Sequence, residues 1–244
     1  IDISNLDKIT TVIHLAGATL GAGDDEMMHL QSNELTTFNL LRSVSNHCCD
    51  FIYASSQVVY GNPDNLNIDE NFKLNSSISP YACSKLNSEN WLRWFQSKVS
   101  LRCISLRLCG FVDGGGLIDY LISSAAKNAN IELYGNGKVV RDYITSLDAI
   151  TAIINAMDVI NSLEREFLPI NIGSGQPLTS IKIAEIIIDC LESKSNIVIL
   201  DKDAPFKNLM LNIDRAKNVL NFKPSNLPKS IKEYALNKNE DHNE

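Results

Sequence analysis

The sequence predicts an α/β fold built on a parallel sheet, and three features of the chain lead to this prediction. Short apolar, β-branched runs alternate with amphipathic segments along most of the 244 residues. Short loops separate these segments, and no internal repeat or low-complexity stretch interrupts the alternation. Strands and helices that alternate in this way form parallel sheets covered by helices on both faces. Right-handed crossovers then bring the carboxyl ends of the strands to one edge, where open α/β sheets bind ligands.

The individual elements follow from hydrophobic spacing and from turn residues. The runs predicted to be strands cover residues 11–15, 51–54, 100–108, 131–134, 139–144, 170–172 and 197–200. The segments with helical spacing cover 27–44, 80–95, 117–127, 148–160 and 180–192, with shorter helices from about 214 and after 228. Pro80 is a favourable first residue for the helix at 80–95. Thr179 or Ser180 can cap the start of the helix at 180–192. Residues 61–80 are rich in Asn, Pro, Asp and Ser and indicate a loop.

Composition narrows the class of protein. A hydrophobic content of 44% with 21% charged residues is typical of a globular soluble protein. The net charge of −7 gives no electrostatic reason to expect nucleic acid or an acidic membrane surface as a partner. No apolar run approaches the roughly 20 residues of a membrane span. The six cysteines lack C-x-x-C spacing, so we expect no metal site and no disulfide framework, and a location in the reducing cytoplasm.

The stretch that carries chemistry is Tyr81-Ala82-Cys83-Ser84-Lys85. Tyr81 and Lys85 are four residues apart and therefore share one face of a helix. An ammonium at this place favours the phenolate and lowers the pKa of the tyrosine from about 10 towards the range of a general base. Such pairs are also common on ordinary helices. The pair gains weight because Ala16-Gly17, Ser55-Ser56 and the turn at 109–115 are expected to converge on the same edge of the sheet.

An ordered set of motifs resembles the extended short-chain dehydrogenase/reductase family, in particular its NAD-dependent nucleotide-sugar epimerase/dehydratase group of the UDP-glucose 4-epimerase type. The matching residues run almost from end to end: Val12-Ile13-His14-Leu15-Ala16-Gly17, Asn33 with Asn39-Leu40-Leu41, Ser55-Ser56-Gln57-Val58-Val59-Tyr60-Gly61, Glu70, Ser79-Pro80-Tyr81 with Ser84-Lys85, Tyr134-Gly135-Asn136-Gly137, Arg141-Asp142-Tyr143-Ile144 with Asp148, Asn171-Ile172-Gly173-Ser174-Gly175, and Asp214 with Lys217 and Pro224. The resemblance implies a Rossmann-like parallel sheet with a smaller C-terminal substrate-binding α/β domain. The expected dinucleotide-binding domain comprises residues 1–111 and 145–173, and the substrate-binding domain comprises 112–144 and 174–240.

The same resemblance implies roles for single residues. Tyr81 is expected to act as base and acid on the sugar hydroxyl, while Lys85 lowers its pKa and holds the nicotinamide ribose. Ser56 is expected to hydrogen-bond the same sugar oxygen. The residues expected to contact NAD are Asp2, Leu15, Ala16, Gly17, Ser55, Tyr81 and Lys85, with Asp2 placed at the adenine.

Substrate contacts are implied for three residues. Besides Ser56, Arg141 matches the arginine that clamps the diphosphate with its planar guanidinium fork, and Tyr134 falls where the family packs the nucleotide base. A purely structural alternative exists for both. Arg141 could pair with Asp142 or Asp148, and Tyr134 could be an ordinary packing residue.

The expected reaction moves a hydride from a sugar carbon, usually C4, to the nicotinamide while Tyr81 removes the hydroxyl proton. Return of the hydride to the opposite face inverts that carbon. Dehydratases of the group typically carry an Asp-Glu pair after the serine or threonine, and here those positions are Gln57 and Val58. An NAD-dependent epimerase is therefore favoured. One alternative is an NADPH-dependent keto-sugar reductase, for which the cofactor would be NADP in its reduced form. The other is a non-catalytic binding protein on a truncated dehydrogenase scaffold. A homodimer through the helices at 26–46 and 81–97 is expected by resemblance.

The chain also departs from the family pattern. No G-x-x-G-x-x-G turn precedes residue 16, so a βαβ unit of roughly 30 residues that cradles the dinucleotide pyrophosphate is expected to be missing, by truncation or by degeneration. Gly110 replaces an asparagine that contacts the diphosphate in many members. The second phosphate-binding arginine is absent, and residues 201–212 offer only Lys202 and Lys207. These differences leave the identity of the nucleotide sugar open.

Overall fold

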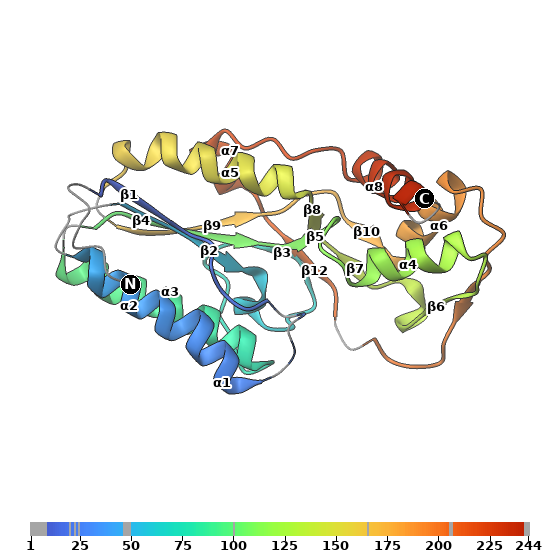
Figure 1. Cartoon of the computed structure of the whole chain (residues 1–244), viewed down its shortest axis with the longest axis horizontal. Coiled ribbons are helices and arrows are strands. Elements are labelled where there is room, and N and C mark those ends of the chain that lie inside the picture. Colours follow the sequence, from blue (N-terminus) through green and yellow to red (C-terminus); the bar gives the residue numbers. More distant parts are fainter. Residues whose placement is uncertain are drawn as a thin grey trace.

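A parallel sheet of four strands forms the centre of the larger half of the protein (Figure 1). The computed structural model describes residues 9–19, 21, 23, 25–45, 50–99, 101–164, 166–204 and 207–241. The strands, in spatial order, are β1 (Thr11–His14), β2 (Asp50–Ser56), β4 (Cys103–Leu108) and β9 (Phe167–Ile172). All three neighbouring pairs are parallel, so their carboxyl ends lie at one edge. The predicted α/β fold with a parallel sheet is confirmed.

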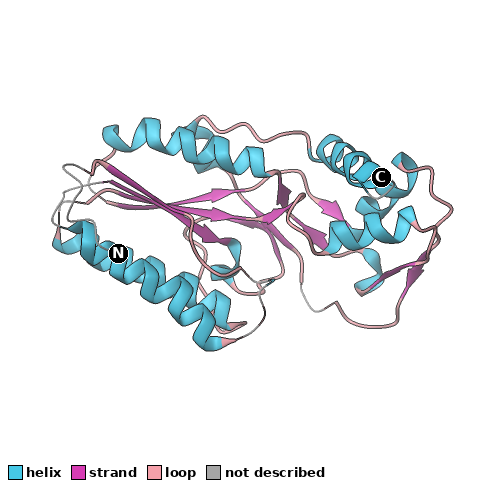
Figure 2. Cartoon of the chain, in the orientation of Figure 1, coloured by secondary structure: helices cyan, strands magenta, loops and turns pink. Residues whose placement is uncertain are grey.

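Helices cover both faces of this sheet, as the sequence predicts (Figure 2). One face carries a long helical segment made of α1 (Glu26–His29), a π-helical turn (Leu30–Leu35) and α2 (Thr36–Val44), next to α3 (Pro80–Lys98). The opposite face carries α5 (Ser146–Val159) and α7 (Asp214–Leu220). No helix among the described residues is both long enough and apolar enough to cross a membrane.

Local sequence signals explain where the two central helices begin. Helix α3 starts at Pro80 because the Ser79 hydroxyl accepts a hydrogen bond from the backbone N–H of Ala82 at 3.1 Å. Helix α5 starts two residues before the predicted residue 148. Thr145 and Asp148 form a reciprocal capping box there, which satisfies backbone groups of the first turn.

The alternation of side chains along β2 divides the larger half into two cores. Phe51 and Tyr53 point towards α2 and α3 and pack with Leu41 and Leu92. Ile52 points to the other face and belongs to the core beneath α5. Each of these five side chains is at most 1% exposed. The cores hold β2 rigidly between its neighbours, and this fixes the position of its carboxyl end.

The smaller half has a core of its own. Its elements are α4 (Leu117–Ala126), β6 (Ile131–Leu133), β7 (Val140–Arg141), β10 (Leu178–Thr179), α6 (Ser180–Cys190), β11 (Ile197–Ile199) and α8 (Leu227–Asp241). Their apolar residues, among them Leu121 and Ile187, form a separate cluster. The short parallel pair of β5 (Gly110–Phe111) and β8 (Tyr143–Ile144) joins the two halves. Residues 209–222, which the sequence places in the second domain, contribute to the first core, so the domain boundaries remain a proposal.

One strand lies inside the segment that the sequence describes as a loop. Strand β3 (Asn65–Ile68) pairs in parallel with β12 (Leu209–Leu211), and neither strand was predicted. In strand β3 the polar Asn65 and Asn67 alternate with Leu66 and Ile68. Ile68 is fully buried, and this single anchor with the backbone pairing is what makes the segment a strand. The pairing attaches the connection between β2 and α3 to the C-terminal part of the chain.

The β3–β12 pairing gives a direct stability prediction. Replacing the buried Ile68 by Ala is expected to lower the free energy of unfolding by about 2–5 kcal/mol, as large-to-small core substitutions do. Leu66→Ala, on the same strand but at a side chain that is 43% exposed, is expected to change it by less than about 1 kcal/mol. Urea unfolding of both variants measures the difference. Equal effects would contradict the burial of β3.

Candidate active site

Helix α3 and strand β2 bring together the three residues predicted to be catalytic. Tyr81 and Lys85 lie on the face of α3 that meets the end of β2. The Lys85 Nζ donates a hydrogen bond of 2.8 Å to the backbone carbonyl of Ala54, and it lies 5.9 Å from the centroid of the Tyr81 ring. Ser56, the last residue of β2, hydrogen-bonds with Tyr81. The predicted constellation of serine, tyrosine and lysine therefore exists in three dimensions.

The protonation of this group differs from the expectation. Burial raises the pKa of Tyr81 above its ordinary value, although the hydrogen bond with Ser56 acts in the opposite direction. The expected lowering by Lys85 is not observed. Burial lowers the pKa of Lys85 itself to about 8, while the negative charge of Glu89 counteracts this shift. In this structure Tyr81 is therefore a phenol at neutral pH, which suits a proton donor better than a proton acceptor.

The carboxyl end of β1 forms the next part of the edge. Leu15 is 56% exposed, and Ala16 and Gly17 are exposed as well, so the backbone of these three predicted cofactor residues borders open space. A side chain at position 17 would collide with the amide oxygen of Asn33, which explains the glycine. Asp2 lies outside the described residues.

Ser55, also predicted at the cofactor, points away from this edge. Its side chain is 3% exposed and donates a hydrogen bond of 2.7 Å to the Glu89 carboxylate on α3. The reason is the two-residue period of the strand, which sends Ser55 and Ser56 to opposite sides of β2. A contact of Ser55 with a cofactor would therefore involve its backbone.

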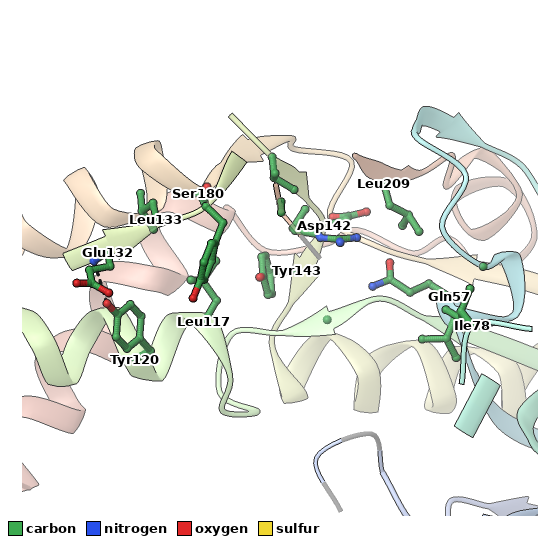
Figure 3. Close-up of a pocket in the computed structure, with 17 residues that line it drawn as sticks. Gln57, Ile78, Leu117, Tyr120, Glu132, Leu133, Asp142, Tyr143, Ser180 and Leu209 are labelled. Carbon is green, nitrogen blue, oxygen red and sulfur yellow. Dashed lines mark hydrogen bonds between the residues drawn. The ribbon is translucent and has the colours of Figure 1, made fainter. Parts of the chain in front are cut away.

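A cavity of about 580 Å³ lies between the sheet edge and the smaller half of the protein (Figure 3). Gln57 and Ile78 lie at one end, Tyr143 in the middle, and Tyr120 with Glu132 at the other end. The lining residues are Gln57, Val58, Gly61, Ile78, Gly110, Leu117, Tyr120, Glu132, Leu133, Tyr134, Val139, Arg141, Asp142, Tyr143, Ser180, Ala204 and Leu209. Its volume and mostly apolar lining are typical of small-molecule sites.

Both residues predicted at the nucleotide, Arg141 and Tyr134, line this cavity. Ser56, Tyr81 and Lys85 do not line it within the described part of the chain. Gln57 directly follows Ser56, and Ile78 precedes Tyr81 by three residues, so the cavity reaches the catalytic group from one side. The predicted binding residues thus line a cavity that begins next to the predicted catalytic group, which itself lies outside the lining.

The two acidic residues considered as structural partners of Arg141 have other hydrogen bonds. Asp142 accepts hydrogen bonds from the backbone N–H of Ser174 at 2.9 Å and from its hydroxyl at 2.6 Å. Asp148 accepts from Thr145 at the start of α5 and from Ser225 at 2.9 Å. Burial lowers the pKa of Arg141, and the nearby Tyr143 counteracts this effect. The binding role of Arg141 therefore stays a prediction.

The structure explains why Gly110 replaces the asparagine that many family members carry. A side chain at this position would approach the ring of Tyr143 to about 3.0 Å. Tyr143 therefore occupies the space of the missing side chain, and both residues line the cavity.

Several cavity residues were not identified from the sequence. Gln57 is the clearest case, because its side-chain oxygen is buried and has no hydrogen-bond partner among the described residues. Its position directly after Ser56 was a usable signal. Tyr120 and Glu132 are brought together by a hydrogen bond of 2.9 Å from the Glu132 backbone N–H to the Tyr120 hydroxyl, and no sequence pattern indicates this contact.

The buried ammonium of Lys85 gives a prediction for pH dependence. Because the pKa of Lys85 falls from 10.5 to about 8 on folding, the unfolded chain binds more protons between these values. Stability is therefore full above pH 10.5 and declines by about 3 kcal/mol as the pH falls towards 8. Lys85→Met removes this dependence. The difference in unfolding free energy between the natural protein and Lys85→Met should change by that amount across this interval, with Lys98→Met as the surface control. A constant difference would contradict the burial of the charge.

Comparison with known proteins identifies the family of the chain. A family model described as the NAD-dependent epimerase/dehydratase family matches residues 2–173. A dTDP-4-dehydro-6-deoxyglucose reductase of Escherichia coli is 29% identical over 239 residues, covering 92% of this chain and 73% of that enzyme. The UDP-glucose 4-epimerase of Drosophila melanogaster is 26% identical and covers 80% of this chain. The chain spans 63% of the length of the Drosophila enzyme, which is less than two thirds.

Solved structures show the same fold. A UDP-N-acetylglucosamine 4-epimerase from Methanobrevibacter ruminantium, solved with UDP-N-acetylmuramic acid, superposes with a TM-score of 0.83 at 24% identity, covering 96% of this chain and 78% of that one. A UDP-glucose 4-epimerase from Stenotrophomonas maltophila with bound NAD reaches 0.84 at 19% identity, covering 96% and 77%. The cofactor of the matched family is NAD, in agreement with the sequence prediction. The extent of the family match shows that the chain belongs to the NAD-dependent epimerase/dehydratase family.

Proposed function

We propose that this protein is a nucleotide-sugar epimerase that uses NAD to invert one sugar carbon, C4 of a nucleoside-diphosphate hexose. The observation that supports this most strongly is the grouping of Ser56, Tyr81 and Lys85 at the end of β2, where Gln57, the residue after Ser56, lines the same cavity as Arg141. A binding protein without catalysis has no need of a buried lysine beside a buried tyrosine. We take the proposed chemistry of this trio as the reason for its cost in stability.

The residues at the sheet edge fit a bound dinucleotide. The exposed backbone at Leu15, Ala16 and Gly17 offers a path along the end of β1. We assign the Lys85 ammonium to the nicotinamide ribose. A hydrogen bond to the backbone carbonyl of Ala54 fixes its position. When bound, NAD supplies the acceptor and donor of the hydride, and the protein supplies orientation and proton transfer.

Tyr81 handles the proton in the proposed reaction. Its hydroxyl faces Ser56, so a sugar oxygen placed between them would be hydrogen-bonded by both side chains. Tyr81 first loses its own proton to solvent, and the resulting phenolate accepts the hydroxyl proton as the sugar carbon is oxidised to a ketone. The phenol returns that proton when the carbon is reduced. Because burial raises the pKa of Tyr81, the phenol form is the stable one, and proton return is the easier of the two steps.

Arg141 and Tyr134 would hold the nucleotide end of the substrate. A guanidinium fork can bind two phosphate oxygens at once, and the aromatic ring of Tyr134 is 44% exposed and available for stacking on a base. Gln57, next to Ser56, lines the same cavity as these two residues. A substrate lying along it would place its sugar at the catalytic end.

A keto-sugar reductase is the second candidate. It is supported by the 29% identity to the dTDP-4-dehydro-6-deoxyglucose reductase, which covers 92% of this chain. A dehydratase is disfavoured, because Gln57 and Val58 provide no carboxylate next to Ser56 for the removal of water.

The direct test incubates the protein with NAD and a panel of UDP- and dTDP-hexoses and follows C4 by proton NMR. An epimerase interconverts two sugars without net formation of reduced cofactor, whereas a reductase consumes NADPH with a keto sugar.

Tyr81→Phe should lower kcat by about 10²-fold or more. Arg141→Lys should act mainly on KM, raising it about tenfold because the bidentate contact is lost. Tyr120→Phe, at the far end of the cavity, is the matched tyrosine control. Full activity of Tyr81→Phe would refute the assignment.

We also propose a homodimer formed through the face that carries α1, α2 and α3. Met27, Leu30 and Trp94 on this face are 56%, 36% and 50% exposed, which is more apolar exposure than helices in water usually retain. Sedimentation velocity should report twice the chain mass, and Trp94→Glu should shift it to a single chain. Leu147→Glu, at an exposed leucine on α5 across the sheet, is the control. A monomeric natural protein would contradict the proposal.

A further inference from the structure

A fully buried carboxylate, Glu89, lies on α3 one turn after Lys85, and the reaction described above does not use it. Its side chain is 0% exposed. Five hydrogen bonds hold its two oxygens: from Ser55 Oγ at 2.7 Å, Ser105 Oγ at 2.9 Å, Arg107 Nε at 3.0 Å, Arg107 Nη2 at 2.8 Å and Arg93 Nη2 at 3.1 Å. Such complete satisfaction of a buried charge indicates that its position is tightly defined.

Glu89 continues a series of contacts between α3 and the end of β2. Residues 81, 85 and 89 are spaced by four and therefore share one face of the helix. Each of them contacts a different residue at the carboxyl end of the strand. The contacts are Tyr81 with the Ser56 hydroxyl, Lys85 with the Ala54 carbonyl, and Glu89 with the Ser55 hydroxyl. The helix thus meets three consecutive strand residues.

The charge of Glu89 is stable where it lies. Burial opposes ionisation, but the hydrogen bonds and the positive charge of Arg107 outweigh it and hold the pKa of Glu89 below its ordinary value. Arg107 is itself only 1% exposed and extends the network to the Tyr60 hydroxyl at 2.8 Å. Glu89 is therefore a permanent anion one helical turn from the Lys85 ammonium.

The other groups that face Lys85 carry no negative charge at neutral pH. They are the ring of Tyr53, with its centroid 4.9 Å from Nζ, the ring of Tyr81, and His14 on β1. Burial, with Lys85 adding to the effect, lowers the pKa of His14 to about 4, so His14 is neutral. Burial also raises the pKa of both tyrosines. Glu89 is the negative charge to which the Lys85 ammonium is coupled.

We propose that Glu89 is a positioning residue for the proposed epimerase reaction, which sets the end of β2 against Tyr81 and compensates the buried ammonium of Lys85. It would not touch substrate or cofactor. It would act by keeping Ser56 in line with Tyr81 through Ser55, and by keeping Lys85 charged at the pH at which the enzyme works.

A purely structural ion pair between Glu89 and Arg107 makes a different prediction. It would stabilise the core without electrostatic coupling to Lys85, so replacing Glu89 would leave the titration of Lys85 unchanged. The titration therefore separates the two roles, and it needs neither substrate nor cofactor. Its result does not depend on whether the proposed epimerase reaction is correct, since failure to convert any nucleotide sugar would refute that reaction alone.

The experiment compares the natural protein with Glu89→Gln, a substitution of equal size. The protein is labelled with ¹³Cε-lysine, and the Lys85 signal is assigned by its absence in Lys85→Met. We expect the Lys85 titration midpoint of Glu89→Gln to lie below that of the natural protein by about one pH unit or more, because the nearest anion is lost. Ser105→Ala is the matched control, since it removes a hydrogen bond to the same carboxylate but keeps the charge. Its midpoint should be unchanged.

An unchanged midpoint in Glu89→Gln would overturn the proposal and leave Glu89 as a core ion pair. If the buried Arg107 prevents Glu89→Gln from folding, the double variant Glu89→Leu with Arg107→Met removes both charges, and such apolar replacements of buried pairs are usually tolerated. Its Lys85 midpoint is compared with that of Arg107→Met alone, which separates the loss of the Glu89 charge from the loss of the Arg107 charge, and the same two outcomes decide. Ser55→Ala tests the strand contact separately. It should lower kcat with little effect on KM while the Lys85 midpoint stays constant, and an unaltered kcat would remove that part of the proposal.

Discussion

The contact between helix α3 and the carboxyl end of strand β2 is the constraint on which the candidate site depends. Strand β2 lies between β1 and β4, so its register cannot change without breaking the hydrogen bonds to both neighbouring strands. Ser79 and Pro80 fix where α3 begins. Once both are set, residues spaced by four on the helix must meet the strand end. The polar groups buried between them, Glu89 and Arg107 above all, prevent any sliding, because a shift of one element would leave charges unpaired in the core.

The burial of Lys85 and Glu89 lowers the stability of the fold, and other parts of the structure compensate for this loss. A buried lysine and a buried glutamate destabilise a core unless their hydrogen bonds are complete. Here the backbone of β2 and side chains of β4 supply hydrogen bonds to Lys85 and Glu89. The surrounding apolar cores on both faces of the sheet provide the stability that makes such burial possible. Proteins often keep a destabilising group where it serves chemistry. In the proposed reaction, the buried ammonium of Lys85 is such a group.

Most of the fold could be predicted from the sequence, because its strands are short apolar runs and its helices have clear starts. The parallel sheet, α3 with Tyr81 and Lys85, and the family followed from these local signals. Strands β3 and β12 did not, because polar residues such as Asn65 and Asn67 form a strand only through pairing with a distant segment. The protonation of Tyr81 was also beyond the sequence, since it depends on how much solvent the folded chain excludes. The four-residue spacing predicts that Tyr81 lies near Lys85, but burial determines whether Tyr81 is charged.

The most direct test of the account uses a nucleotide hexose deuterated at C4 as substrate, with NAD present and with unlabelled reduced cofactor added in excess. The account predicts a slower reaction than with the unlabelled sugar. It also predicts that the deuterium remains at C4 of the epimer, because the ketone stays beside Tyr81 and Ser56 until the hydride returns. Loss of deuterium to the solvent, or its replacement by hydrogen from the added cofactor, would contradict an epimerase that works within a single site.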